Sequence, residues 1–243
     1  MAMISVRNFA KSFDDKVVHR DINFDVQPGE CLGLLGGSGA GKSVILRSLI
    51  GLVKPDSGQI LIDGEDITKY DERELVEIRK KVAYVFQGGA LFDSLTVYDN
   101  LAYTLREHTD MTEDEMSERI HTVLAEFGLE GNDLVYPADL SGGMQKRVGL
   151  ARSIIMRPEV ILYDEPTAGL DPYNTKRIQE MILTLKGRGK TSVFVTHDMP
   201  SALAVCDKLA LVIKGEISCI ESVDKYQTDP ECMIKDFIEG RFA

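Results

Sequence analysis

One glycine-rich segment constrains this chain more than any other feature, because it fits a phosphate-binding loop. It satisfies the pattern G-x-x-x-x-G-K-[ST] with Gly36, Gly37, Ser38, Gly39, Ala40, Gly41, Lys42 and Ser43. The apolar run 31–35 predicts a buried strand before it, and 43–52 predicts a helix after it. Glycines let successive N–H groups face a phosphate, and the helix N-terminus adds partial positive charge.

This loop predicts two distinct contacts with a nucleotide. We expect Lys42 to reach the β- and γ-phosphates and the Ser43 hydroxyl to coordinate Mg²⁺. The alternative, a glycine-rich loop that merely turns the chain, is disfavoured by the strand before it and the helix after it.

A pair of carboxylates follows a second buried strand. The apolar run 160–163 ends at Asp164 and Glu165, and ligands of parallel sheets bind at the carboxyl ends of strands. We expect Asp164 to contact Mg²⁺, directly or through water, and Glu165 to polarise the attacking water as general base. The pair could instead be a helix cap and a surface charge, an alternative that the phosphate loop disfavours.

The remaining pattern predicts an α/β protein with an insertion. Of the 243 residues 44% are hydrophobic and 28% charged, which excludes a disordered or collagen-like chain. Strands alternating with helices indicate a parallel, doubly wound sheet, and the period of two before residue 26 indicates antiparallel strands. Residues from about 95 to 155 read as mostly helical, and we expect their acidic run 113–115 to be a solvated helix face.

Charge and cysteine usage limit the partners and the compartment. The net charge of −11, from 28 Lys and Arg against 39 Asp and Glu, predicts no nucleic-acid partner. The first residues do not read as a signal peptide, and no stretch approaches the roughly 18 apolar residues of a membrane span. At a membrane, another chain would therefore supply the span. We expect reduced, mostly core-filling thiols at Cys31, Cys206, Cys219 and Cys232.

A third motif carries the resemblance to a known family. The segment Leu140-Ser141-Gly142-Gly143-Met144-Gln145 opens a predicted helix, so its hydroxyl and N–H groups can form a second anion nest. Placed between the phosphate loop and the Asp–Glu pair, it resembles the signature of ABC-type ATPase subunits, over essentially the full chain. The resemblance implies that Ser141, Gly142 and Gly143 close over the γ-phosphate bound to a second copy, in a homodimer with two ATP at its interface.

Four further positions match the family. Gln87 follows the predicted strand 82–86, as the glutamine that senses Mg²⁺ and the γ-phosphate does in the family. His197 resembles the histidine that contacts the γ-phosphate, and Asp171 ends a segment, 168–171, that resembles the loop crossing the dimer interface. Phe13 falls where an aromatic residue stacks on adenine, although an isolated Phe is more often a core residue. Three other histidines match nothing and are expected to be surface or packing residues: His19, His108 and His121.

The resemblance also implies a domain plan. The whole of 1–243 is expected to be one ABC ATPase domain of the α/β class. Its RecA-like P-loop core and antiparallel β subdomain would comprise 1–87 and 156–222. The inserted helical subdomain would be 88–155, and 223–243 a C-terminal tail.

The segment after Gln87 indicates which subgroup of the family the chain resembles. Gly88-Gly89-Ala90-Leu91-Phe92-Asp93-Ser94-Leu95-Thr96-Val97 resembles the ATPases of Mla/Mce-type systems, which move phospholipids between bacterial membranes, although relatives more often have Ser at Gly88. This resemblance implies phospholipid transport linked to outer-membrane lipid asymmetry, with permease subunits docking near Leu91–Asn100. It also implies an Mce-domain lipid-binding protein, a small regulatory subunit, and a cytoplasmic position on the inner membrane.

Two alternatives stay open at this point. The chain could serve another substrate, such as an amino acid, an ion, a drug or a lipoprotein. It could also be an ABC ATPase of repair or translation, which the acidic charge argues against.

Overall fold

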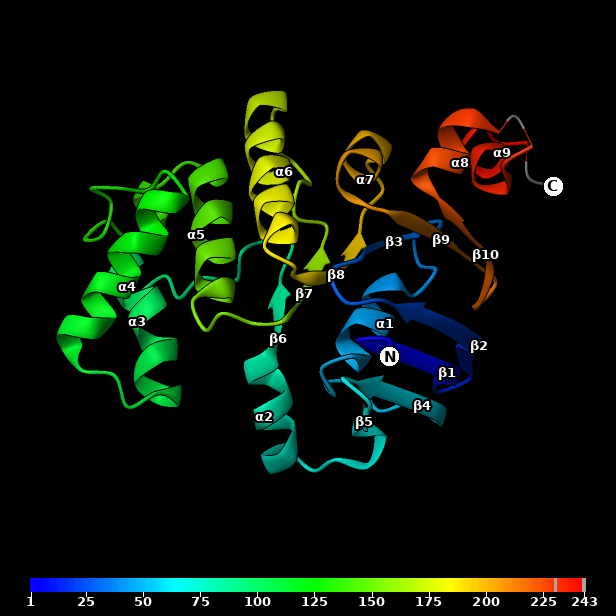
Figure 1. Cartoon of the computed structure of the whole chain (residues 1–243), viewed down its shortest axis with the longest axis horizontal. Coiled ribbons are helices and arrows are strands. Elements are labelled where there is room, and N and C mark those ends of the chain that lie inside the picture. Colours follow the sequence, from blue (N-terminus) through cyan, green and yellow to red (C-terminus); the bar gives the residue numbers. More distant parts are fainter. Residues whose placement is uncertain (230, 242–243) are drawn as a thin grey trace.

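A mixed β-sheet organises the residues that the computed structural model describes, 1–229 and 231–241 (Figure 1). Its spatial order is β5-β4-β1-β2-β10-β9-β3-β8-β7-β6. The strands are β1 (Ile4–Phe13), β2 (Lys16–Val26), β3 (Cys31–Leu35), β4 (Ser57–Ile62), β5 (Glu65–Asp66), β6 (Val82–Val85), β7 (Val160–Asp164), β8 (Thr191–Val195), β9 (Lys208–Ile213) and β10 (Glu216–Ser222). The helices are α1 (Lys42–Ser48), α2 (Glu72–Lys81), α3 (Val97–His108), α4 (Glu113–Glu126), α5 (Gly142–Ile154), α6 (Pro172–Gly187), α7 (Met199–Val205), α8 (Val223–Thr228) and α9 (Met233–Ile238).

The parallel part of the sheet comprises β9, β3, β8, β7 and β6. Every residue of β3, β7 and β8 is buried, which confirms the strands predicted from the apolar runs 31–35 and 160–163. Successive side chains of a strand point to opposite faces. In β7, Val160 and Leu162 accordingly enter one hydrophobic core, while Ile161 and Tyr163 enter the other. A strand between two cores needs apolar residues at both its odd and its even positions, which explains the unbroken apolar run of β7.

The first strands form the predicted antiparallel part. β1 pairs antiparallel with both β2 and β4, and in β2 the buried residues Ile22, Phe24 and Val26 alternate with exposed ones. β10 was not predicted: it returns antiparallel to β9 after a turn at Lys214 and Gly215, which have φ of 51° and 84°. One parallel pairing joins β10 to β2, so the predicted parallel and antiparallel parts belong to one continuous mixed sheet.

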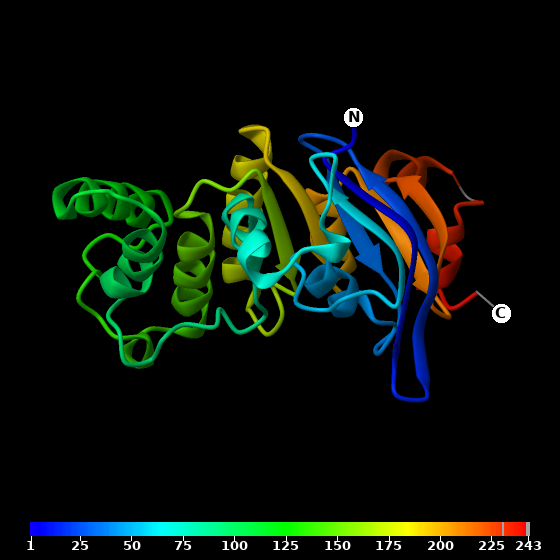
Figure 2. The same cartoon turned by 90° about the horizontal axis from the view of Figure 1, so that it is seen from below.

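Helices α3, α4 and α5 lie together at one end of the molecule, and α8 and α9 lie at the other end (Figures 1 and 2). Helix α4 begins with a capping box between Thr112 and Glu115, and its acidic first turn, 113–115, is exposed as expected. Carboxylates in a first turn also interact favourably with the helix dipole. Helices α2 and α7 were not predicted.

The tail packs on the chain's own core. Val223, Cys232 and Ile234 are buried, and the Glu221 carboxylate accepts hydrogen bonds from Lys225 Nζ (2.6 Å) and Cys232 Sγ (2.7 Å). The described cysteines are free thiols, three of them buried, as expected of core filler. Within 1–229 and 231–241, none of the helices has both the length and the apolar character needed to cross a membrane.

Candidate active site

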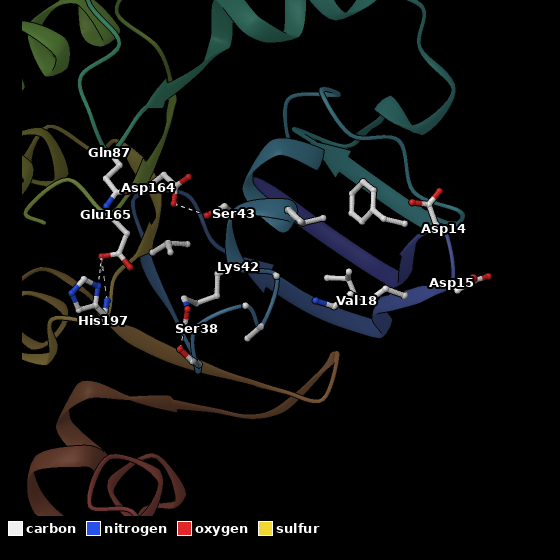
Figure 3. Close-up of a pocket in the computed structure, with 18 residues that line it drawn as sticks. Asp14, Asp15, Val18, Ser38, Lys42, Ser43, Gln87, Asp164, Glu165 and His197 are labelled. Carbon is white, nitrogen blue, oxygen red and sulfur yellow. Dashed lines mark hydrogen bonds and ion pairs between the residues drawn. The ribbon is translucent and has the colours of Figure 1, made fainter.

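An open cavity of about 1350 Å³ lies where the carboxyl ends of β3, β6, β7 and β8 meet (Figure 3). The predicted site residues that line it are Phe13, Gly36, Ser38, Gly39, Ala40, Gly41, Lys42, Ser43, Gln87, Asp164, Glu165 and His197. Gly37 belongs to the same loop but is not among the lining residues. Parallel pairing therefore gathers residues that are up to 161 positions apart (36 to 197) at one edge of the sheet, and Phe13 joins them from the antiparallel strand β1.

The phosphate loop has the backbone that its glycines permit. Gly39 and Gly41 have φ of 78° and 86°, in the left-handed region. A Cβ at Gly36 would lie 2.6 Å from the Val212 carbonyl oxygen, so the loop approaches β9 more closely than a side chain allows. Gly41 begins α1 without a capping side chain, which leaves first-turn N–H groups to a ligand.

Lys42 folds back across its own loop. Its ammonium donates hydrogen bonds to the carbonyl oxygens of Gly36 (2.8 Å) and Gly37 (3.1 Å). Burial lowers the pKa of Lys42, and the carboxylates of Glu165 and Asp164 partly oppose this shift. The positive charge is thus held inside the loop, where an anion would contact it.

The carboxylate of Asp164 is held by two hydroxyl groups. Ser43 Oγ donates to Oδ1 at 2.9 Å, and the Tyr84 hydroxyl donates to Oδ2 at 2.7 Å. Burial and Asp164 raise the pKa of Tyr84 well above its usual range, so this hydroxyl remains a donor. The sequence analysis missed Tyr84, because only the pairing of β6 with β7 brings its hydroxyl to Asp164 and no local pattern indicates that pairing.

Glu165 and His197 lie in contact with each other at one side of the cavity (Figure 3). Glu165 Oε2 lies 2.8 Å from His197 Nδ1 and accepts the His197 backbone N–H at 3.3 Å. Glu165 itself has a φ of 52°, a left-handed conformation that non-glycine residues rarely adopt, and its N–H donates to the Val195 carbonyl oxygen at 2.9 Å. The carboxylate is therefore fixed by contacts from the loop after β8.

The two remaining lining residues of the prediction lie at or just after the ends of different strands of the sheet. Gln87 follows β6 and lies near Glu165 (Figure 3). Phe13 ends β1 with 44% of its surface exposed, and Lys11 Nζ lies 5.3 Å from the ring centroid. An exposed ring beside a phosphate loop provides a surface on which a base can stack.

The signature segment and Asp171 do not join this cavity. Ser141 caps α5, and its hydroxyl accepts the Met144 N–H at 3.3 Å. Asp171 caps α6 by accepting the Asn174 N–H at 3.0 Å, and a Cβ on Gly143 would lie 2.4 Å from Asn174 Oδ1. The starts of α5 and α6 thus lie together, while Ser141, Gly142, Gly143 and Asp171 lie outside the cavity of their own chain.

His19 contacts the phosphate loop, a role that the sequence did not indicate. It is fully buried, so it is a packing residue rather than a surface one, and its Nε2 lies 3.0 Å from the Gly41 carbonyl oxygen. Burial lowers its pKa. A Cβ at Gly41 would lie 2.4 Å from His19 Nε2, so glycine is required there by space as well as by φ.

These features define a nucleotide-hydrolysing cassette, and the comparison with protein families agrees. The profile described as ABC transporter matches residues 19–168, more than half of the chain. The chain belongs to the ABC transporter family and is its ATP-binding, ATP-hydrolysing subunit.

Individual relatives cover nearly the whole chain. It is 40% identical over 239 residues to the "Probable ribonucleotide transport ATP-binding protein mkl" of Mycobacterium leprae (strain TN), covering 98% of this chain and 69% of that protein. It is 34% identical over 239 residues to the "Intermembrane phospholipid transport system ATP-binding protein MlaF" of Escherichia coli (strain K12), covering 98% and 89%.

A solved structure also aligns with most of this chain. The dimeric, post-hydrolysis structure of the ATP-binding cassette MJ0796 bound to ADP and Pi aligns with a TM-score of 0.84 at 31% identity. The alignment covers 91% of this chain and 99% of that chain. The expected fold, an ABC ATPase cassette of the α/β class, is confirmed.

Proposed function

We propose that this ATPase subunit powers the transport of phospholipid between membranes, linked to outer-membrane lipid asymmetry. Phospholipid is proposed as the substrate because the chain is similar to MlaF over 98% of its length and contains the Mla/Mce-type segment that begins at Gly88. The arrangement of side chains in the cavity supports ATP hydrolysis as the reaction.

Three residues perform the hydrolysis in this proposal. Lys42 releases the carbonyl oxygens of its loop and contacts the β- and γ-phosphates. Glu165 polarises the attacking water, and His197 holds the Glu165 carboxylate through the 2.8 Å contact and reaches the γ-phosphate. Phe13 stacks on the adenine base.

The oxygen donors of the cavity fit Mg²⁺. Ser43, Asp164 and Gln87 offer a hydroxyl, a carboxylate and an amide oxygen, the donor types that a hard cation prefers. Bound there with ATP, Mg²⁺ would neutralise charge that develops on the phosphates. The 2.9 Å contact between Ser43 and Asp164 already brings two of these donors together.

The working unit is a homodimer with two ATP at its interface. Ser141, Gly142 and Gly143 begin α5 outside the cavity of their own chain, so a second copy is needed to bring them to a γ-phosphate. Asp171, at the start of α6 beside them, lies at the same interface. The match to a dimeric cassette supports this arrangement.

The permease subunits dock near Leu91–Asn100, within a helical subdomain of residues 88–155. Asn100 is fully buried, and its side chain donates to the carbonyl oxygens of Phe92 (3.1 Å), Leu95 (3.1 Å) and Thr96 (2.9 Å), which shapes this segment. Phe92 stays 46% exposed on it. An Mce-domain lipid-binding protein and a small regulatory subunit complete the complex, and this ATPase subunit lies on the cytoplasmic face of the inner membrane.

A second candidate cargo is a ribonucleotide. The observation that favours it is the name of the mkl relative, which has the higher identity, 40%. The cassette chemistry is the same for both cargoes.

The test isolates the transporter in its closed state. Glu165→Gln protein is purified with ATP from membranes of its native cells, and the co-purifying proteins and lipids are identified by mass spectrometry. Glu159→Gln, an exposed carboxylate outside the cavity, is the matched control. We expect a permease, an Mce-domain protein and phospholipid.

Other outcomes would change the conclusion in distinct ways. A permease with bound ribonucleotide and no lipid would favour the second candidate. Nucleic acid or ribosomes without a membrane protein would overturn the transport proposal and leave the ATPase chemistry intact.

A further inference from the structure

A second cavity of about 770 Å³ lies on a different part of the molecule and shares no residue with the nucleotide cavity. One wall is a single face of α4, and the other is formed by the end of α5, the start of β7 and the end of α6. Its floor is apolar, with Val123, Ile154, Ile161 and Leu185. The cavity therefore lies between α4 and the sheet core, in the size range of small-molecule sites.

Four cationic side chains converge on this apolar floor. Arg119 comes from α4, Arg157 from the α5–β7 connection, and Arg188 and Lys190 from the segment after α6. Only Arg188 has an ion-pair partner among the described residues: its Nη1 lies 2.7 Å from Glu126 Oε1.

The carboxylates at the cavity do not neutralise the other cations. Glu115 is engaged in the capping box of α4, and Glu126 pairs with Arg188. Glu118 also lines the cavity but is exposed and makes no ion pair among the described residues. Arg119, Arg157 and Lys190 thus have no carboxylate partner in the part of the chain that the structure describes.

Arg119 is the most constrained of these cations. Its Nε is buried without a hydrogen-bond partner, and its Nη1 reaches only the Met111 sulfur, at 3.7 Å. Burial lowers its pKa, and the nearby positive charge of Arg157 lowers it further. A buried donor without a partner, beside a like charge, is costly unless an anion joins it.

We propose that this cavity binds a small amphiphilic anion, a phosphate or carboxylate group carried by an apolar body. The anionic group contacts Arg119 and Arg157, and the apolar body covers the floor at Ile154, Ile161 and Leu185. Such a ligand touches α4 and the sheet core at the same time and restrains their relative movement. The proposal is independent of the cargo and of the nucleotide chemistry.

Isothermal titration calorimetry tests it on the full chain with ADP saturating the nucleotide cavity. The probes are dihexanoyl phosphatidic acid, phenyl phosphate and inorganic pyrophosphate. We expect one of the two amphiphiles to bind with one site per chain and at least tenfold more tightly than pyrophosphate. Preference for the phosphatidic acid identifies a lipid source, and preference for phenyl phosphate identifies a soluble one.

Variants separate this site from non-specific association. Arg119→Gln and Arg157→Gln should each weaken the binding about tenfold, because each removes a charge-assisted contact. Arg73→Gln is the control, since Arg73 is an exposed arginine of α2 outside the cavity. Lys190 lies in a loop of the same cavity, so Lys190→Gln is the replacement variant if Arg119→Gln fails to fold.

Hydrogen exchange gives an independent measurement. Amides of 113–126 should exchange more slowly when the amphiphile is bound, and this slowing should be lost in Arg157→Gln. Absence of binding by both amphiphiles, equal binding of pyrophosphate, or affinities unchanged in both arginine variants would overturn the proposal.

Discussion

The hydroxyl of Tyr84 offers the sharpest test of how the cavity holds its metal ligand. Tyr84→Phe removes one oxygen, which lies 2.7 Å from Asp164 Oδ2, and leaves the ring in place beside Phe86, at 4.4 Å between centroids. Without this donor, Ser43 is the one side chain among the described residues that donates a hydrogen bond to the Asp164 carboxylate. The carboxylate can then rotate away from the orientation that a metal ion needs.

The magnitude follows from the kind of hydrogen bond. A hydrogen bond to a charged group contributes about 1.5–3 kcal/mol, and because Tyr84 is only half-buried we take the lower end. About 1.4 kcal/mol corresponds to a factor of about ten in an equilibrium constant. The Mg²⁺ concentration that half-saturates ATP hydrolysis should therefore rise about tenfold, while ATP binding in EDTA stays unchanged.

The assay combines ATPase rates in a Mg²⁺ titration with Mn²⁺ binding to ADP-loaded protein, followed by electron paramagnetic resonance. Tyr70→Phe is the matched control, because it also removes a phenol donor to a carboxylate, Glu65 at 3.1 Å, but outside the cavity. An unchanged Mg²⁺ and Mn²⁺ dependence in Tyr84→Phe, or the same shift in Tyr70→Phe, would refute the reasoning.

Three further substitutions test the remaining assignments. Glu165→Gln should keep ATP binding and reduce the hydrolysis rate by a factor of about 10² or more, since general-base catalysis contributes that much; near wild-type turnover would remove Glu165 as the base. Lys42→Ala should weaken ATP binding at least tenfold in a fluorescent-nucleotide titration, because a charge-assisted contact is lost; an equal affinity would contradict the phosphate assignment. Ser141→Arg should block hydrolysis but not binding by monomers, and in mixed dimers with Lys42→Ala the lesion should act on the nucleotide of the other chain. A lesion confined to the chain's own nucleotide would exclude the proposed dimer.

Local patterns allowed much of the fold to be predicted. The apolar runs of β3 and β7 identify strands between two cores, and the glycine loop and Asp164 then follow at the carboxyl ends of these strands. The return strand β10 was missed because its turn, at Lys214 and Gly215, lacks the proline or asparagine that often marks such a turn.

The missed parts of the site depend on contacts between distant segments. Tyr84 reaches Asp164 across 80 positions, and only the register of β6 beside β7 brings them together. His19 contacts the phosphate loop from β2, across 22 positions, although β10 and β9 lie between β2 and β3 in the sheet. The cavity around Arg119 likewise needs α4 to lie against the end of α6, which no local pattern specifies.

The left-handed backbone at Glu165 has an evolutionary consequence. A φ of 52° costs an ordinary side chain roughly 1–2 kcal/mol, whereas glycine adopts it freely. A drift to glycine at this position would therefore make the fold more robust while it removes the carboxylate that polarises water. At the end of β7, selection for stability favours glycine and selection for ATP hydrolysis favours glutamate. The glutamate found there indicates that selection for hydrolysis has been the stronger of the two.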